Sequence, residues 1–288
     1  MSIAQKAYQD IINQIDDYSK KYGKDVLWFR GENKLFPSMP SSMAREVSKL
    51  FGITDYQRSI RVNEQNLILD YERWILEGFK RHITIVHHDG YNHTPLYSWY
   101  ILYFLQHYGI PTRFIDWSQS VDIALFFAYL RELENGDDAR LWIIDPKLFN
   151  QLTRGEYEIK SPNNTYEEFV QLSRPFAISQ KPVAISPNSD VGRVSIINQR
   201  IYSQYGFFVY AGLQYYDLRF LISMLAKSHN VEVNQVLYGI TIPYEQIMLI
   251  GQYLNDVLGI NKKALRLDEP NNLREKFSIE NYCREKNK

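Results

Sequence analysis

Residues 106–118 carry the densest group of chemically capable side chains in this 288-residue chain. The segment reads QHYGIPTRFIDWS and is followed by a strongly apolar run. Its members that can hydrogen-bond, stack or carry charge are His107, Tyr108, Thr112, Arg113, Asp116, Trp117 and Ser118. A strand with a purely structural role rarely needs so many such groups, because each loses hydration on burial. The segment therefore predicts a functional site.

A second group of candidate residues surrounds Arg30. This arginine follows the β-prone pair Trp28-Phe29 and precedes Gly31. An arginine at the end of a short strand presents a planar fork suited to phosphate or carboxylate. The glycine allows the backbone to turn or to approach a ligand closely. Arg30 and Gly31 are therefore predicted to belong to the same site as the first segment.

Internal ion pairs are the alternative explanation for both arginines. Arg113 would then pair with Asp116, and Arg30 with Glu64. A buried arginine needs such a partner whether or not a ligand is also bound. The sequence leaves both interpretations open.

Charge and cysteine content limit the classes of function. Thirty-three Lys and Arg balance thirty-three Asp and Glu, so no overall field attracts nucleic acid or an acidic membrane. The single Cys283 excludes an internal disulfide and a zinc site of the CxxC type. No signal segment and no window of about 18 apolar residues is visible. We expect a cytoplasmic protein that neither spans nor binds a membrane, in which local arginines hold any anionic ligand.

Common cofactor and metal motifs are absent from the sequence. There is no Walker loop, no glycine-rich dinucleotide turn and no Gly-x-Ser-x-Gly elbow. The histidines His82, His87, His88 and His93 lack the spacing of metal ligands, so residues 82–93 are predicted to form a solvated loop. No metal site is predicted.

The pattern of apolar residues predicts an α+β fold with mixed small sheets flanked by helices. Helices are expected over residues 4–21, 56–80, 95–106, 121–131, 217–227 and 244–258. Strands are expected over residues 26–29, 112–116, 141–144, 183–185, 206–210 and 236–242. The polar, proline-containing residues 153–190 are predicted to be an insertion with a short helix at 166–172.

These residues resemble the FRG domain, a family named for its Phe-Arg-Gly motif. The resemblance is carried by WFRG at 28–31, the helix bearing Glu64, QHYGIPTRFIDWS and the following IALFFA at 123–128. RIYSQYGFF at 200–208 is similar to the family's Arg-x-x-x-Gln-x-Gly-x-Phe block, and ITIP at 240–243 resembles its C-terminal pattern. Glu32, Ser118 and residues 265–268 depart from the family pattern. The spacing of apolar residues predicts a separate helix at 1–22, and the resemblance implies an FRG domain at 23–270 followed by a tail at 271–288.

The order of these motifs also resembles ADP-ribosyltransferase folds, which bind NAD between two small sheets. That resemblance implies an ADP-ribosyltransferase-like core with NAD as substrate. Arg30 would hold an NAD phosphate or ribose, Arg113 would neutralise the pyrophosphate, and Tyr108 or Trp117 would stack on nicotinamide. Gln204 stands where such enzymes use Glu, so Asp116 or Glu64 would have to stabilise the oxocarbenium-like transition state.

Both resemblances together define the predicted site. The catalytic candidates are Arg30, Arg113, Asp116 and Gln204. The candidates for ligand binding are Gly31, Glu64, His107, Tyr108, Thr112, Trp117 and Ser118.

Three hypotheses of function follow from these residues. The first is an NAD-consuming, ADP-ribosyltransferase-like effector, of the toxin or phage-defence kind, that modifies a macromolecular acceptor. The second is a non-catalytic module that binds a nucleotide or another phosphorylated metabolite. The third is a nucleic-acid-acting domain, which the neutral charge balance and the lack of a carboxylate metal cluster disfavour.

Overall fold

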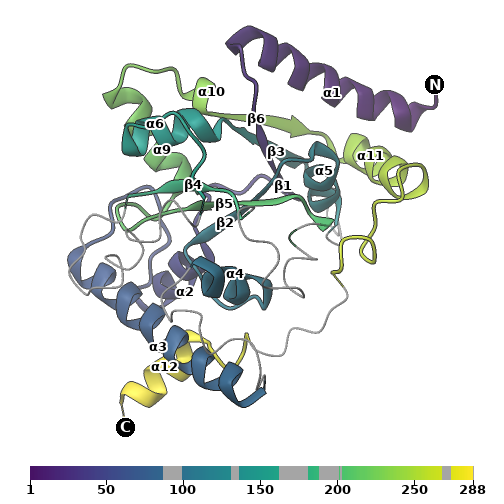
Figure 1. The fold of residues 1–288 in the computed structure, drawn as a ribbon. Helices are drawn as coiled ribbons and strands as arrows, with labels where there is room; N and C mark the ends of the chain where they lie inside the picture. The colour runs from purple at the N-terminus through teal and green to yellow at the C-terminus, as the bar shows by residue number, and fades with distance from the viewer. Residues whose placement is uncertain are drawn as a thin grey trace.

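The computed structural model describes residues 1–86, 99–130, 136–161, 181–187, 201, 203–267 and 274–287. Within these residues the predicted α+β class is confirmed, since helices pack on both faces of a β-sheet (Figure 1). The small sheets expected from the sequence are joined into one open sheet of six strands. None of the helices in the described residues is long and apolar enough to cross a membrane.

The sheet is antiparallel throughout and has the order β4-β5-β2-β1-β3-β6. The strands are β1 (Trp28–Glu32), β2 (Phe114–Ser118), β3 (Ala139–Ile144), β4 (Val183–Ile185), β5 (Gly206–Tyr210) and β6 (Leu237–Ile242). Strand β1 pairs with β3 along all five of its residues, and β2 pairs equally with β5. In contrast, β1 and β2 share only the pair Phe29–Ser118. The sheet is therefore opened along the seam between these two central strands.

The helices include several that the sequence patterns did not predict. They are α1 (Ile3–Tyr22), α2 (Ser42–Leu50), α3 (Val62–Val86), α4 (Trp99–His107), α5 (Val121–Tyr129), α6 (Pro146–Arg154), α9 (Leu218–Ser228), α10 (Val233–Val236), α11 (Tyr244–Asp256) and α12 (Ile279–Lys286). Helices α2, α6, α10 and α12 were not expected. The predicted loop at 82–93 was wrong at its start, because α3 includes His82. His87, His88, His93 and the predicted helix at 166–172 lie outside the described residues.

Three hydrophobic clusters hold the helices on the sheet. On one face α1, α5 and α11 pack on β1, β3 and β6, while α2, α3, α4 and α12 pack on β2, β4 and β5. On the opposite face α6, α9 and α10 cover the side chains of Trp28, Ile115 and Val209. Figure 1 shows α1, α5 and α11 on one side of the molecule and α3 and α12 on the other. The two groups of helices on the first face thus separate near the β1–β2 seam.

Gly31 allows α5 to lie directly on β1. A Cβ at this position would come within 1.8 Å of the carbonyl oxygen of Ala124 and 2.6 Å of the amide of Ala128. Both contacts are with the helix backbone, which cannot move aside as a flexible side chain would. The glycine is therefore required by helix packing, whatever it contributes to the site.

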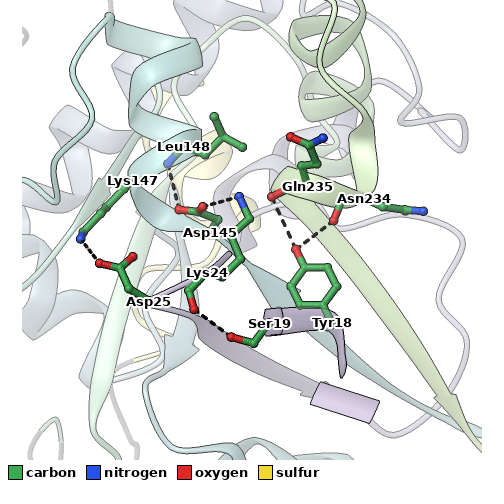
Figure 2. A network of polar contacts seen from close by, with 9 residues as sticks. All are labelled: Tyr18, Ser19, Lys24, Asp25, Asp145, Lys147, Leu148, Asn234 and Gln235. Atoms are coloured by element: carbon green, nitrogen blue, oxygen red, sulfur yellow. Dashed lines mark hydrogen bonds and ion pairs between the residues drawn. The ribbon is translucent and has the colours of Figure 1, made fainter. Parts of the chain in front are cut away.

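A buried polar network joins the end of α1 to α6 and α10 (Figure 2). Lys24 forms a 2.7 Å ion pair with Asp145, and both side chains are buried. Asp145 also caps α6 by accepting a hydrogen bond from the amide of Leu148, and Pro146 occupies the first turn. The hydroxyl of Tyr18 donates to the carbonyl of Asn234 at 2.8 Å. Gly23 ends α1 in the left-handed conformation.

The C-terminal residues, expected to be a tail, take part in the core. Phe277 and Ile279 are buried against α3, and the hydroxyl of Tyr71 donates to the carbonyl of Phe277 at 2.6 Å. Helix α12 is capped by Ser278. The residues from 274 onward therefore stabilise the side of the sheet that α3 covers.

Candidate functional site

A cavity of about 740 Å³ lies at the seam between β1 and β2. Seven of the predicted site residues line it: Arg30, Gly31, His107, Asp116, Trp117, Ser118 and Gln204. Backbone alternation directs Arg30 and Trp117 to one face of the sheet and Asp116 and Ser118 to the other. Both sets reach the same cavity, because β1 and β2 pair at a single position. The volume falls in the range of small-molecule sites.

Arg30 bridges the opened seam. Its Nη1 donates to the carbonyl of Asp116 at 2.9 Å, so a side chain supplies a donor to β2 from across the seam. Its Nε lies 3.4 Å from Oε1 of Glu32. Glu32 is itself buried and accepts a 2.9 Å hydrogen bond from Nε1 of Trp142. The predicted pair between Arg30 and Glu64 does not form.

Asp116 is held by a chain of side chains that begins at Thr112. The hydroxyl of Thr112 donates to Oε1 of Gln106, and Nε2 of Gln106 donates to both carboxylate oxygens of Asp116 at 2.9 and 2.8 Å. Thr112 also accepts from the amide of Phe114 at 3.1 Å, which orients its hydroxyl. Asp116 is exposed to solvent between buried neighbours on β2. Its carboxylate is therefore oriented by a neutral amide.

Two further arginines reach the cavity, Arg45 from α2 and Arg274 from the segment before α12. Nη1 of Arg45 donates to the carbonyl of Pro40 at 2.8 Å. Among the described residues neither arginine has a carboxylate within ion-pair distance. The side chain of Arg45 is exposed overall, but partial loss of hydration, and next the nearby charge of Arg30, lower its pKa from the ordinary value. The cavity thus holds positive charge that the described residues do not neutralise.

Trp117 is a lining residue whose side chain belongs to the hydrophobic cluster that α6, α9 and α10 cover. Its side chain is only 3% exposed, and no described residue accepts a hydrogen bond from its Nε1. A buried donor without a partner costs free energy, which a ligand or an ordered water would recover.

Ser118 and Gln204 line the cavity and hold nearby main chain in place through hydrogen bonds. Oγ of Ser118 donates to the carbonyl of Gln204 at 2.8 Å and accepts from the amide of Ser120 at 3.0 Å. Nε2 of Gln204 donates to the carbonyl of Leu265 at 3.0 Å. Both side chains therefore position the backbone around the cavity as well as lining it.

Four predicted site residues lie away from the cavity. Arg113 is buried in a two-bond ion pair with Glu72, where the sequence alternative had named Asp116 as its partner. Glu64 caps the start of α3 and binds both terminal nitrogens of Arg58. Tyr108 packs against Phe79 in the core beside α3. Thr112 is fully buried and acts on the cavity only through Gln106.

The sequence prediction missed Gln106, Arg45 and Arg274 as site residues. Gln106 is the first residue of the QHYGIPTRFIDWS segment, but its role appears only when the hydroxyl of Thr112 is seen to orient it. Arg45 lies on α2, which was not expected. Ser41 is the signal that marks this helix, because its side chain caps the first turn by accepting from the amide of Ala44.

These features define an α+β protein with a cationic cavity at an opened seam of its sheet. Residues 25–137 match the family model of the FRG domain, so the chain contains an FRG domain over this range. Arg30, Arg45 and Asp116 lie inside the matched region, whereas Gln204 and Arg274 lie beyond it. No curated protein matches the chain. No solved structure matches it either.

Proposed function

We propose that the cavity binds a phosphorylated small molecule of the nucleotide class. The observation that carries this proposal is the group of three arginines, Arg30, Arg45 and Arg274, around one cavity. Guanidinium groups recognise phosphate through paired N–H donors, and they keep their charge at every physiological pH.

The electrostatics of the cavity support an anionic ligand. Arg30 and Arg274 both act on Arg45 as like charges, in surroundings that strip away part of its hydration. Glu32 and Asp116, the carboxylates among the described lining residues, offset only part of this charge. An incoming phosphate would relieve the repulsion and supply the missing hydrogen-bond acceptors. The cavity volume also suits a nucleotide better than a free phosphate ion.

NAD is the specific ligand that we propose to test first, with ADP-ribosyl transfer as a second function. Asp116 favours that second function, because it brings an oriented carboxylate to the cavity that holds Arg30. Transfer would break the bond between ribose and nicotinamide, form a bond from the ribose to a nucleophile, and release the proton of that nucleophile. Asp116 would stabilise the positive charge that develops on the ribose. Glu64, the other predicted carboxylate, lies outside the cavity and takes no part.

Thermal melting in the presence of NAD, ADP-ribose, ADP and inorganic phosphate tests binding, because a ligand of the native state raises stability by mass action. We expect nucleotides to raise the melting temperature of the wild-type chain. Arg45→Gln should weaken binding by about tenfold or more, since a hydrogen bond to a charged group contributes about 1.5–3 kcal/mol. Arg284→Gln is the matched control, because Arg284 is exposed on α12 and is not among the lining residues. No shift with any of the ligands would refute the proposal.

Release of nicotinamide from NAD separates turnover from binding. Wild-type protein should release it, and Asp116→Asn should release it at least tenfold more slowly while still binding ADP-ribose. Binding without release, in the presence of candidate protein and nucleic-acid acceptors, would leave a non-catalytic binding module as the function.

A further inference from the structure

The C-terminal segment, residues 274–287, is attached to one face of α3 (Figure 1). Phe277 is buried there, and Gly78 leaves the space that its ring occupies, since a Cβ at Gly78 would lie 2.8 Å from the ring. The hydroxyl of Tyr71 donates to the carbonyl of Phe277 at 2.6 Å. Tyr71 and Gly78 are seven positions apart and so lie on the same face of the helix. The start of the segment is therefore held in a fixed place.

This attachment determines where Arg274 lies. Arg274 precedes Phe277 by three residues, so the two Cα atoms are within about 11 Å of each other. Arg274 is also the residue of this segment that lines the cavity. The cavity thus receives a guanidinium from a part of the fold that lies beyond residues 25–137, the range that matches the FRG domain.

The three arginines of the cavity differ in exposure and in spacing. Arg30 is partly buried on β1, whereas Arg45 and Arg274 are exposed. Loss of hydration lowers the pKa of Arg45 most, the charge of Arg30 lowers it next, and the charge of Arg274 lowers it less than either. Because repulsion between like charges falls with distance, Arg45 lies nearer to Arg30 than to Arg274. Arg30 and Arg45 therefore form a pair, and Arg274 stands apart from it on the exposed side of the cavity.

One phosphate group between Arg30 and Arg45 uses the donors of that pair and leaves Arg274 unused. A second phosphate joined to the first extends the negative charge toward Arg274, and its oxygens match the paired donors of a guanidinium.

We propose that Arg274 is a specificity-determining residue that makes the cavity select a nucleoside diphosphate over a monophosphate. This inference rests on the proposed function, because it distributes the phosphates of the nucleotide among the three arginines. NAD and ADP-ribose carry the same diphosphate group. The C-terminal segment thus contributes to ligand choice as well as to the core.

Calorimetric titration with AMP and ADP tests the proposal, at about 0.15 M salt so that charges more than about 8 Å apart are largely screened. The wild-type chain should bind ADP about tenfold or more tightly than AMP, because hydrogen bonds from arginine to phosphate are charge-assisted. In Arg274→Gln this preference should fall below about threefold, while the affinity for AMP stays within about twofold of wild type. Arg274→Lys keeps the charge and loses the paired donors, so its preference should lie between these values.

Two further variants serve as controls for charge and for phosphate binding. Arg284→Gln removes the same charge from an exposed position of the same segment that does not line the cavity, and it should keep the full preference for ADP. Arg45→Gln removes one member of the pair and should weaken AMP and ADP by similar factors.

The outcomes separate this inference from the proposed function. Equal affinity of the wild type for AMP and ADP would overturn the role of Arg274 and leave nucleotide binding intact. Absence of binding by AMP, ADP and ADP-ribose would overturn the proposed function. A full preference for ADP in Arg274→Gln, or an equal loss of preference in Arg284→Gln, would show that Arg274 does not select the diphosphate. If Arg274→Gln does not fold, Arg274→Lys gives the same test, and an unreduced preference in that variant would refute the proposal.

Discussion

Arg113 and Glu72 meet along two hydrogen bonds in the core, Nε to Oε1 at 3.1 Å and Nη2 to Oε2 at 2.6 Å. The guanidinium also lies 4.5 Å from the ring centre of Tyr210. Burial alone would lower the pKa of Arg113, but the charge of Glu72 raises it above its ordinary value. The pair ties the middle of α3 to the residue that precedes β2, and so supports the strand that carries Asp116.

Removal of one member of this pair should destabilise the protein strongly. Arg113→Met leaves the Glu72 carboxylate buried without its partner, and we expect a loss of about 3–5 kcal/mol in the free energy of unfolding. Glu72→Leu should cost a similar amount. The double variant should recover most of the loss, because two apolar side chains pack without an unpaired charge. Urea denaturation of the four proteins measures the coupling. Additive losses in the double variant would show that the two residues do not act as a pair.

Gly31→Ala should weaken packing between β1 and α5. The new methyl group would meet backbone atoms of Ala124 and Ala128, so the helix must move, at a cost of about 1–3 kcal/mol or more. Gly206→Ala is the matched control, because a Cβ there meets the nearest atoms of Ile201 at 3.4 Å, an ordinary contact, and its backbone does not need a positive φ. Denaturation midpoints compare the two variants. Equal stability of both would contradict the assigned role of Gly31.

Asp217 should give the protein an unusual dependence of stability on pH. Burial raises the pKa of its carboxyl above the ordinary 3.8, although its Oδ1 accepts from the amides of Met39 and Arg219. The folded protein therefore binds this proton more readily than the unfolded chain. The contribution of Asp217 to stability is fully present below pH 3.8 and is lost as the pH rises through the raised value.

Asp217→Asn removes this titration and keeps an oxygen in the place of Oδ1. The difference in unfolding free energy, wild type minus variant, should fall as the pH rises above 3.8 and then level off. Subtracting the unfolding free energy of the variant removes the pH dependence that comes from the carboxyl groups present in both proteins. A difference that rises with pH would show that the hydrogen bonds from Met39 and Arg219 outweigh burial.

Lys24 should hold the end of α1 in place. In Lys24→Met the buried carboxylate of Asp145 loses its cation, and removal of one partner from a buried pair costs about 3–5 kcal/mol. The bond from Leu148 to Asp145 remains, so the loss should lie at the lower end of that range. Amide hydrogen exchange should increase in α1 more than in α3. Lys20→Met, at an exposed position of the same helix, should change neither measurement.

The local patterns of the sequence were sufficient to find the strands that carry Arg30 and Asp116. Each strand begins with a β-prone apolar pair, Trp28-Phe29 or Phe114-Ile115, and the charged residue follows that pair directly. The end of α1 was also evident, since Gly23 follows an amphipathic run. Local spacing thus predicted these strands, the end of α1 and seven of the residues around the cavity.

Contacts between distant residues could not be read from the sequence. The partner of Arg113 is 41 positions away on α3, whereas Asp116 is a carboxylate only three positions away. Arg274 reaches the cavity from a segment expected to be a tail. Nothing in the order of residues shows that β1 and β2 pair at one position only, which depends on where the flanking helices pack. The interaction partners of these charged residues could therefore be identified only from the three-dimensional structure.

Three consecutive residues of β1 face three different surroundings. Phe29 is buried beneath the helices on β1, Arg30 enters the cavity, and Gly31 accommodates the main chain of α5. An alanine scan scored only by activity would report the whole tripeptide as essential. The scan would not distinguish loss of hydrophobic burial at Phe29, loss of anion recognition at Arg30 and a main-chain clash at Gly31. Substitutions that preserve function should differ at each position: a large aliphatic residue could replace Phe29, a lysine could replace Arg30, and no residue could replace Gly31.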